Sequence, residues 1–569
     1  MYNPANPLII QSDFSVLAEV HHPEFETVRV DLAVFADLEK SPEHIHTYRI
    51  TPLSLWNAAC AGRKPEAIIT FLEQNAKFPL PDNIRREIGH YMARYGLVKL
   101  LAQAPDISAA GLGFDLPTDE YLFLYSHDSP TITAIDRQKD IRKHLAGRLN
   151  ENTLLVPAGK RGIIKQALIR IGYPVEDLAG YIEGEPLAIH LRETTAAGQS
   201  FGLRPYQNEA VNIFHANGLA TGGSGVLVLP CGAGKTVIGL GVMAQVQTNT
   251  LILTTSTTAV RQWIRELLDK TSLTPDEVGE YSADRKDVRP ITVTTYQMIT
   301  YRPEKDGPFP HFQLFNSRPW GFIIYDEVHT LPAPVFQVTA ELQARRRLGL
   351  TATLIREDGR ETDVFTLIGP KKVDIPWREL ERDGWIAPTV CSELRVPMSL
   401  DLRLECAQSG DKIAYRLEAE NPAKLAVVKD LIANHQGESI LVIGQYIKQL
   451  EILAAELNAP LITGKTASAK RDELYEDFRQ GRIPLLVVSK VANFAIDLPD
   501  ASVAIQVSGA FGSRQEEAQR LGRILRPKAD GRGAYFYTVV SKDSREQEFS
   551  HHRQLFLTEQ GYQYIIRDV

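Results

Sequence analysis

The chain has 569 residues, of which 44% are hydrophobic and 23% are charged, a balance typical of folded globular proteins, and its length predicts three or four domains. Its formal net charge of −7 excludes nucleic-acid binding through overall basicity. The four cysteines form no C-x-x-C pair, which argues against a zinc ribbon or a disulfide framework. The sequence shows no secretion signal and no apolar run near the length of about 20 residues that a membrane span needs, so we expect a cytoplasmic protein.

Residues 1–195 predict two small α/β modules. Pro52, Pro65 and Pro81 each precede a plausible helix, as proline does at a first helical turn. Residues 153–171 read as a strand followed by a helix, and a loose region near 104–118 would join the two modules. Residues 1–195 could equally serve only as a structural scaffold or bind nucleic acid.

From about residue 203 onward, short apolar runs alternate with helical stretches. Continuous Val/Ile/Leu runs are typical of parallel strands buried on both faces, so the fold class is α/β with two parallel sheets, at about 200–395 and 425–569. Turn residues follow several runs, which places motifs at the carboxyl ends of strands, where such folds bind ligands. The predicted strands are 225–229, 251–255, 321–325, 440–443, 485–488 and 503–507.

Residues 229–236, Leu-Pro-Cys-Gly-Ala-Gly-Lys-Thr, follow the first of these strands and predict a phosphate loop. Glycines in such a loop let backbone amides turn toward phosphate oxygens at a helix start. Lys235 would contact the β- and γ-phosphates of ATP, and the Thr236 hydroxyl would bind Mg²⁺. Leu229 replaces the first glycine of the strict pattern, so an idle turn is the alternative. The remaining loop residues expected to bind the nucleotide are Pro230, Cys231, Gly232, Ala233 and Gly234.

Asp326 and Glu327 follow the apolar run 321–325. A carboxylate at a strand end beside a phosphate loop can hold Mg²⁺, and its neighbour can orient and deprotonate the attacking water. A solvated acidic pair before a helix is the plain alternative. We expect Asp326 to bind the metal and Glu327 to activate the water.

The segment 513–528 predicts a basic helix, on which Arg520, Arg523 and Arg526 recur every third residue and share one side. It is either a basic surface helix or an arginine finger, which stabilises γ-phosphate charge and accelerates hydrolysis by roughly 10³–10⁵. The phosphate loop and the arginines fall in different predicted sheets. Hydrolysis would therefore open and close a cleft, as in a motor.

Two further segments are weaker signals. Thr351 and Thr353, after another apolar run, would relay between the metal site and a bound polymer, or would simply cap a turn. Arg204 and Gln207 lie in Leu-Arg-Pro-Tyr-Gln, where the Gln207 amide would pair with an adenine edge.

Taken together, these motifs resemble superfamily-2 helicases, and more narrowly the XPB-type (xeroderma pigmentosum group B) DNA-repair helicases. The run 326–329 is similar to that family's DEVH box, and 349–358 resembles its Gly-Leu-Thr-Ala-Thr stretch with the Arg-Glu-Asp motif. The runs 497–499 and 512–523 also follow the family pattern, and 41–49 resembles the amino-terminal domain of bacterial members. The resemblance covers nearly the whole chain.

The resemblance implies two RecA-like motor domains with an ATP cleft between them, preceded by small α/β modules. The implied domains are 1–109 (amino-terminal helicase-associated), 110–198 (damage-recognition-like), 199–395 (motor domain 1, ATP-binding) and 396–569 (motor domain 2, with a short thumb-like segment near 398–422). It also implies that Gln519, Arg523 and Arg526 complete the ATP site and that Asp497 contacts the nucleotide. The residues implied to contact or couple to DNA are Thr254, Thr255, Thr295, Tyr296, His329, Thr351, Thr353, Arg356, Glu357, Asp358, Gln445, Ser489 and Lys490.

The resulting expectation is an ATP- and Mg²⁺-dependent 3′→5′ DNA helicase that acts on single-stranded or tailed DNA in repair. A translocase that moves on duplex DNA without separating strands is one alternative. Another is an ATP-gated scaffold that positions a repair nuclease. An RNA substrate also remains open, because motors that read the backbone select weakly.

Overall fold

The computed structural model describes residues 2–41, 44–105, 120–219, 221–230, 232–304, 307–342, 345–354, 359–489, 501–509, 522 and 533–569. The chain divides into two compact units. The first comprises Met1–Val228 and Gly234–Asp374, and the second comprises Leu229–Ala233 and Ile375–Val569. Within the described part of the chain, no helix is both long enough and apolar enough to cross a membrane.

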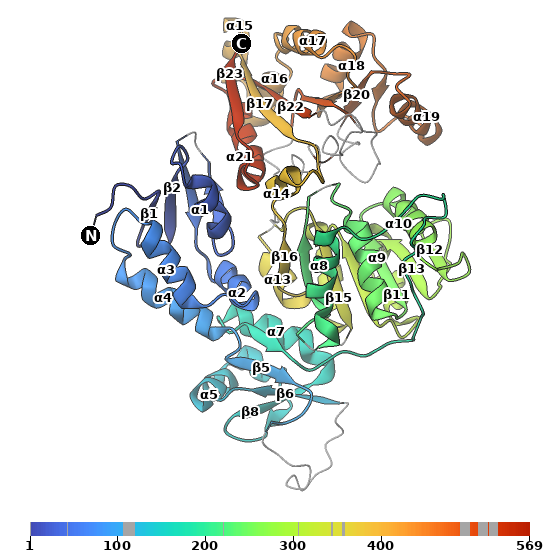
Figure 1. Ribbon diagram of the computed structural model, residues 1–569. Helices are drawn as coiled ribbons and strands as arrows, with labels where there is room; N and C mark the ends of the chain where they lie inside the picture. Colours follow the sequence, from blue (N-terminus) through green and yellow to red (C-terminus); the bar gives the residue numbers. More distant parts are fainter. Residues whose placement is uncertain are drawn as a thin grey trace. The chain divides into compact units, whose positions relative to one another are not determined.

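The first unit begins with a four-stranded antiparallel sheet of order β1-β2-β4-β3 (Figure 1). Its helices start where the prolines predict: α2 begins at Pro52, with Thr51 and Ser54 forming a reciprocal capping box. The elements are β1 (Leu8–Ile10), β2 (Ser15–Glu19), α1 (Phe25–Leu32), β3 (Asp37–Lys40), β4 (Ile45–Arg49), α2 (Pro52–Cys60), α3 (Pro65–Asn75) and α4 (Asp82–Arg94).

A second small sheet follows, with order β7-β8-β6-β5-β9. The strand and helix expected over 153–171 are β8 and α7, and β5 lies before residue 110, the position where we expected this module to begin. Residues 106–119, which contain most of the expected loose join, lie outside the described residues. The elements are β5 (Val98–Leu101), β6 (Tyr121–Tyr125), α5 (Ser129–Arg137), α6 (Lys139–Arg142), β7 (Gly147–Arg148), β8 (Thr153–Pro157), α7 (Arg161–Arg170) and β9 (Val175–Asp177).

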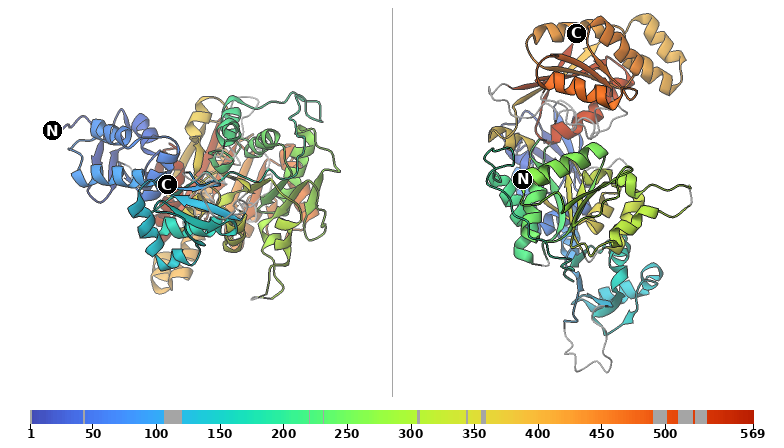
Figure 2. Two further views of the ribbon diagram at one scale, coloured as in Figure 1. Left: turned by 90° about the horizontal axis from the view of Figure 1, so that it is seen from below. Right: turned by 90° about the vertical axis from the view of Figure 1, so that its right-hand side faces the viewer.

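The centre of the first unit is a seven-stranded sheet, all parallel, of order β12-β13-β11-β14-β15-β10-β16. Helices cover both faces (Figure 2). On one face Leu350 packs against Gly239 of α9, and on the other Val335 and Val364 join the core. The elements are α8 (Pro205–His215), β10 (Ser224–Val228), α9 (Lys235–Val246), β11 (Thr250–Thr254), α10 (Thr257–Lys270), β12 (Val278–Tyr281), β13 (Ile291–Thr295), α11 (Tyr296–Ile299), β14 (Phe322–Asp326), α12 (Ala333–Glu341), β15 (Arg346–Thr351), α13 (Glu361–Leu367) and β16 (Lys371–Asp374).

The second unit contains another all-parallel sheet, of order β19-β20-β18-β21-β22-β17-β23. Its strand β17 lies before the boundary expected at 396, and the thumb-like segment near 398–422 holds two helices, α15 and α16. The elements are α14 (Trp377–Arg382), β17 (Thr389–Val396), α15 (Leu400–Gln408), α16 (Asp411–Ala419), α17 (Lys424–Asn434), β18 (Ile440–Gly444), α18 (Ile447–Glu456), β19 (Leu461–Ile462), α19 (Ser468–Arg479), β20 (Leu485–Ser489), β21 (Val503–Gln506), β22 (Ala534–Ser541), α21 (Arg545–Glu559) and β23 (Tyr564–Asp568).

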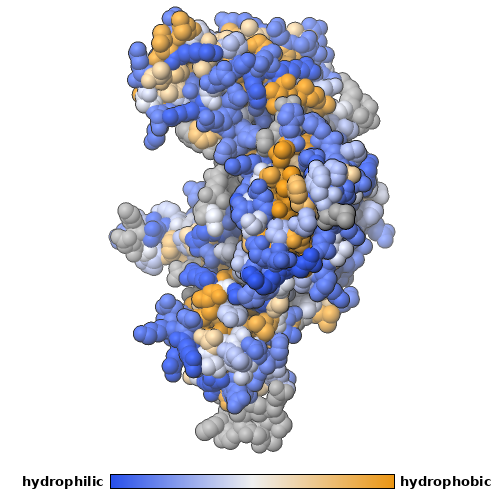
Figure 3. Space-filling model, turned by 90° about the vertical axis from the view of Figure 1, so that its left-hand side faces the viewer, coloured by the Kyte–Doolittle hydropathy of each residue, from blue (hydrophilic) through white to orange (hydrophobic). Residues whose placement is uncertain are grey.

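Two parallel sheets, preceded by two small mixed modules, confirm the predicted α/β class. The first module also covers the edge of the seven-stranded sheet in its own unit. Edge strand β16 offers the backbone N–H of Lys371, which donates to Oδ1 of Asn57 on α2 at 3.0 Å. A side-chain amide thus replaces the missing neighbouring strand at this point. Hydrophilic side chains cover most of the face in Figure 3, with hydrophobic residues in small patches.

Candidate nucleotide site

The predicted phosphate loop leads directly into α9, which begins at Lys235. Gly232 and Gly234 have φ values of +84° and +80°, a left-handed backbone that favours glycine. A Cβ on Gly234 would lie 2.5 Å from Nε2 of Gln207, so the turn has no room for a side chain. Cys231 lies outside the described residues.

The residues at the start of α8 orient the side chain of Gln207 toward this turn. Its side chain is on α8, and the residue is only 3% exposed. Its Oε1 accepts from the backbone N–H of Arg204 at 3.0 Å, while Nη1 of Arg204 lies 3.2 Å from the Tyr206 hydroxyl. The structure therefore brings Gln207 to the phosphate loop.

Lys235 and Glu327 form an ion pair. Nζ of Lys235 lies 3.4 Å from Oε1 of Glu327, and both side chains are largely buried. Glu327 directly follows β14 and has a φ of +50°, an uncommon conformation for a residue with a side chain. The contact joins two motifs that are far apart in the sequence.

Asp326 is held by donors on both of its carboxylate oxygens. Nε1 of Trp263 donates to Oδ2 at 2.9 Å, and the backbone N–H of Glu327 donates to Oδ1 at 3.1 Å. Burial, together with the neighbouring Glu327 carboxylate, raises the pKa of Asp326 to about 6, against the opposing effects of Trp263 and Lys235. Sequence reasoning missed Trp263, because an apolar ring on the buried side of α10 has the pattern of an ordinary core residue.

His329 links the acidic pair to the end of β15. Its Nδ1 lies 2.7 Å from Oγ1 of Thr351 and 3.4 Å from Oε2 of Glu327. Oγ1 of Thr351 donates to the carbonyl of Thr353 at 2.5 Å. Because that hydroxyl proton is used, the ring of His329 is the donor in its bond to Thr351. Thr351 therefore reaches the acidic pair through His329, and the relay to a bound polymer stays a prediction.

The sequence predicts Asp326 and Thr236 as the Mg²⁺ ligands, and a carboxylate and a hydroxyl are oxygen ligands of the kind that Mg²⁺ takes. Among the described residues, no group of three or more His, Cys, Asp or Glu side chains suits a metal ion. Magnesium needs fewer protein ligands, because it usually keeps several waters and binds one or two carboxylates together with substrate phosphates. The half-buried Asp326 is one such carboxylate.

The residues implied to face DNA in the first unit have local partners. Oγ1 of Thr254 donates to the carbonyl of Thr294 at 3.2 Å, and Oγ1 of Thr295 accepts from the N–H of Met298 at 3.0 Å. The Tyr296 hydroxyl donates to the carbonyl of Asp326 at 2.9 Å. Thr255 lies one residue past β11 and is half-buried. Tyr296 therefore connects this group of residues to the acidic pair.

In the second unit, Gln445 directly follows β18 and Ser489 is the last residue of β20, and these two strands are neighbours in the sheet. Oε1 of Gln445 and Oγ of Ser489 are buried and make no hydrogen bond to any described residue. Outside the described residues lie Arg356, Glu357, Asp358, Lys490, Asp497, Gln519, Arg523 and Arg526.

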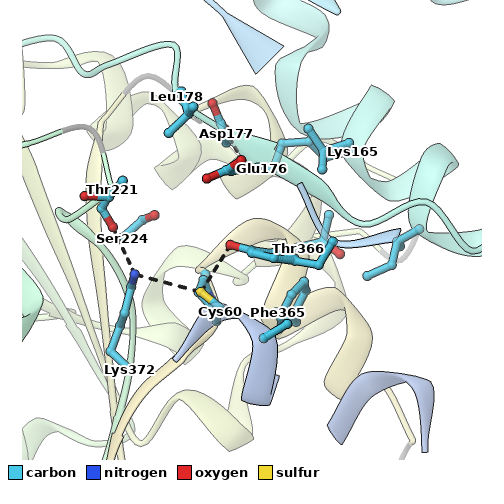
Figure 4. A pocket seen from close by; sticks show the side chains of 16 residues that line it. Cys60, Lys165, Glu176, Asp177, Leu178, Thr221, Ser224, Phe365, Thr366 and Lys372 are labelled. Carbon is cyan, nitrogen blue, oxygen red and sulfur yellow. Dashed lines mark hydrogen bonds and ion pairs between the residues drawn. The ribbon is translucent and has the colours of Figure 1, made fainter. Parts of the chain in front are cut away.

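A separate cavity of about 210 Å³ lies elsewhere in the first unit (Figure 4). Its lining includes Ser224 and Lys372 from the first residues of β10 and β16, so it opens at the amino ends of strands, opposite to the phosphate loop. The Tyr95 hydroxyl donates to Sγ of Cys60 at 3.2 Å, and Nζ of Lys372 donates to the carbonyl of Thr221 at 2.9 Å. It is not the nucleotide site.

Two parallel α/β domains, a phosphate loop that opens a helix and an Asp-Glu-x-His strand end together define a superfamily-2 helicase, an ATP-dependent enzyme. Three family models match the chain. The model described as ERCC3/RAD25/XPB C-terminal helicase matches residues 380–568, that of the type III restriction enzyme res subunit matches 200–356, and that of a helicase conserved C-terminal domain matches 8–150.

Curated relatives narrow this class further. The "DNA 3'-5' helicase XPB" of Mycobacterium tuberculosis is 52% identical over 562 residues, which cover 99% of this chain and 98% of the relative. The protein of the same name from Kineococcus radiotolerans is 51% identical, over 99% of this chain and 96% of the relative. The "General transcription and DNA repair factor IIH helicase/translocase subunit XPB/SSL2" of Saccharomyces cerevisiae is 31% identical, over 99% of this chain and 72% of the relative. The chain belongs to the XPB family of DNA helicases, in its bacterial form.

Proposed function

We propose that this protein couples ATP hydrolysis to 3′→5′ translocation along DNA and to duplex unwinding, in the cytoplasm and in DNA repair. The observation that carries the proposal is the ion pair between Lys235 and Glu327 at 3.4 Å. The pair supports the proposal because a cation suited to bind phosphate lies beside a carboxylate suited to activate water. The direction of movement and the role in repair are supported by the names of the bacterial and yeast relatives.

In this proposal Lys235 binds the β- and γ-phosphates, and Asp326 and Thr236 hold Mg²⁺, which would neutralise phosphate charge. Glu327 orients the attacking water and accepts its proton. Gln207 hydrogen-bonds the adenine edge, Pro230 lines the nucleotide site, and loop residues 231–234 offer backbone N–H groups to the phosphates. Gln519, Arg523 and Arg526 from motor domain 2 complete the site, and Asp497 contacts the nucleotide.

Coupling to DNA is assigned to a second set of residues. His329 and Thr351 connect the acidic pair to the segment that ends in Arg356, Glu357 and Asp358, which we place at the DNA fork. In motor domain 2, Gln445 and Ser489 receive the DNA backbone, and their positions at the carboxyl ends of the neighbouring parallel strands β18 and β20 support this assignment. The same four domains are proposed, with the second beginning by Val98 and the fourth by Thr389, because β5 and β17 belong to their sheets.

Unwinding of a duplex with a 3′ tail, compared with the same duplex carrying a 5′ tail, tests the proposal. We expect ATP-dependent strand separation from the 3′-tailed substrate only. Glu327→Gln should keep ATP binding and lose DNA-stimulated hydrolysis by about 10²–10⁴, the range of general-base catalysis. Hydrolysis at the wild-type rate in Glu327→Gln would refute the assignment of the base.

A duplex-DNA translocase without strand separation is the second candidate, because the yeast relative is named a helicase/translocase. It predicts ATP turnover on closed duplex DNA without unwinding of either tailed substrate. A third candidate, an ATP-gated scaffold for a repair nuclease, predicts normal repair by the hydrolysis-deficient Glu327→Gln variant. Comparing the stimulation of ATP hydrolysis by DNA and by RNA oligonucleotides of the same sequence tests which nucleic acid is the substrate.

A further inference from the structure

A group of aromatic and basic side chains lies beyond the carboxyl end of β12, the edge strand of the seven-stranded sheet in the first unit (Figure 1). They come from the turn after β12 and from the segment between α11 and the 3₁₀ helix η3 (Pro310–Asn316). The neighbouring strand β13 ends at Thr295, which the family resemblance implies to face DNA, and paired strands lie about 5 Å apart. We call this group the Tyr301 patch, and its members are Lys286, Tyr301, Arg302, Phe309 and His311.

The rings of the patch continue a series that begins in the core. Tyr281, the last residue of β12, is buried, and its hydroxyl is hydrogen-bonded to Nδ1 of His311 at 2.9 Å. The ring centroids of these two residues are 5.7 Å apart, and the ring of Tyr301 follows at 6.1 Å from His311. Tyr301 is 55% exposed. The outermost ring is therefore supported by its neighbours and still has enough free surface to stack on another flat ring.

Two cations accompany these rings. The guanidinium carbon of Arg302 lies 5.1 Å from the ring centroid of Phe309, and Nζ of Lys286 lies 4.8 Å from that of Tyr281. A ring attracts a cation through its quadrupole but has no net charge, so such a contact orients the cation without neutralising it. Both cations are exposed, and neither forms an ion pair with a described residue. Their charges therefore remain available to an anionic ligand.

Met298 of α11 connects the patch to the residues implied to face DNA. Its backbone N–H donates to Oγ1 of Thr295 at 3.0 Å, and its carbonyl accepts from the N–H of Tyr301 at 3.4 Å. Its Sδ accepts from Nζ of Lys286 at 3.5 Å. One residue thus contacts the end of β13, the exposed ring and one of the cations. The patch extends the row of DNA-facing strand ends outward by one strand.

A single-stranded nucleic acid combines the chemical groups that this surface can bind. Its unpaired bases have flat faces that stack on aromatic rings, and its phosphates attract cations. In a duplex the faces of the bases are covered by their neighbours, so an exposed tyrosine has no base to stack on. The free cations and the continuity with Thr295 favour this polyanion over a protein as the ligand.

We infer that the Tyr301 patch binds single-stranded DNA, with one base stacked on Tyr301 and with Arg302 and Lys286 contacting neighbouring phosphates. The inference rests on the proposed function, in which this protein moves along DNA. It adds a base contact to a path that is otherwise assigned to the DNA backbone. Every base has a flat face, so this contact strengthens binding without selecting a sequence.

Binding of fluorescent oligo(dT) to the full chain, followed by anisotropy, tests this. Tyr301→Ala should weaken binding by about 5- to 150-fold, the range for the loss of one base stack, while Tyr301→Phe keeps the ring and should bind within about twofold of wild type. Arg302→Gln should lower the slope of log affinity against log salt by about 0.7, as expected for one phosphate contact. Tyr2→Ala is the matched control, because Tyr2 is 58% exposed and lies outside the patch. A blunt duplex of the same length should bind wild type and Tyr301→Ala equally.

Wild-type affinity for oligo(dT) in Tyr301→Ala overturns the inference. So does an equal loss in Tyr301→Phe and Tyr301→Ala, because the ring would then not be the binding group. A loss of the same size in Tyr2→Ala, or on the blunt duplex, would show an effect that is not specific to unpaired bases at this patch, and it overturns the inference as well. Failure of the proposed function gives a different result: the wild-type protein itself then binds no DNA, and DNA does not stimulate its ATP hydrolysis.

Discussion

The imidazole of His329 and the hydroxyl of Thr351 meet at 2.7 Å, and this bond joins the acidic strand end of β14 to the end of β15. Both side chains are buried, so the bond does not exchange with water. In the proposed mechanism it carries the state of the nucleotide toward the DNA-facing segment.

Thr351→Val should separate ATP hydrolysis from unwinding. The valine keeps the shape of threonine and removes the acceptor for His329, so we expect ATP turnover within about threefold of wild type and a loss of unwinding of about tenfold or more. The unwinding rate is measured by stopped flow and the ATP turnover by steady-state hydrolysis, with the same DNA substrate in both assays. Thr366→Val, which removes a hydroxyl that donates to the carbonyl of Thr362 within α13, is the control. Equal losses of both activities would contradict the coupling role.

The affinity for Mg²⁺-ATP should depend on pH through Asp326. Burial raises the pKa of this carboxyl from its ordinary value to about 6 in the metal-free protein, and only the ionised form binds the cation. Affinity should therefore be constant above about pH 7 and fall by about tenfold per pH unit well below 6. A fluorescent ATP analogue titrated between pH 5 and 8 measures this. The same slope without Mg²⁺ would show that another group is responsible.

Trp263→Phe should move that profile to higher pH. The indole N–H donates to Oδ2 of Asp326 at 2.9 Å and favours the ionised form. A hydrogen bond to a charged group is worth about 1.5–3 kcal/mol, so the midpoint should rise by about one to two pH units. Trp320→Phe, whose buried Nε1 instead donates to the carbonyl of Leu314, should leave the midpoint in place. An unchanged midpoint in Trp263→Phe would refute the role of the indole.

Asp177→Asn should destabilise the first unit strongly. The Asp177 carboxylate accepts from Arg161 at 2.8 and 3.0 Å and from Lys165 at 2.9 Å, in a buried cluster. Removing one partner of such a cluster costs about 3–5 kcal/mol, because the cations lose their counter-charge. Urea or thermal unfolding measures this loss. Asp140→Asn, in an exposed pair with Lys143, should cost less than about 1 kcal/mol.

The same cluster gives a pH dependence of stability. Burial alone would raise the pKa of Asp177, but Lys165 and Arg161 hold it well below its ordinary value. A carboxyl with a depressed folded-state pKa stabilises the protein above its unfolded pKa of about 4, and this stability is lost as the pH falls below that value. The free energy of unfolding of wild type should therefore fall more steeply below pH 4 than that of Asp177→Asn.

The sequence predicted most of the fold, because buried parallel strands leave a continuous apolar signal, as at 440–443 and 503–507. It also predicted Lys235, Asp326 and Glu327 as one group, because the ends of parallel strands converge. Trp263 could not be predicted, since its indole N–H is directed by tertiary packing rather than by any spacing in α10.

The amide of Asn57 on the edge of β16 has a practical consequence for truncated proteins. A motor fragment that begins near residue 200 would lose α2 and expose the backbone N–H of Lys371 along an open strand. Exposed edges of this kind pair with other chains. Such a fragment should self-associate in solution more than the full chain does, and any change in its activity would then reflect aggregation as well as the loss of residues 1–199.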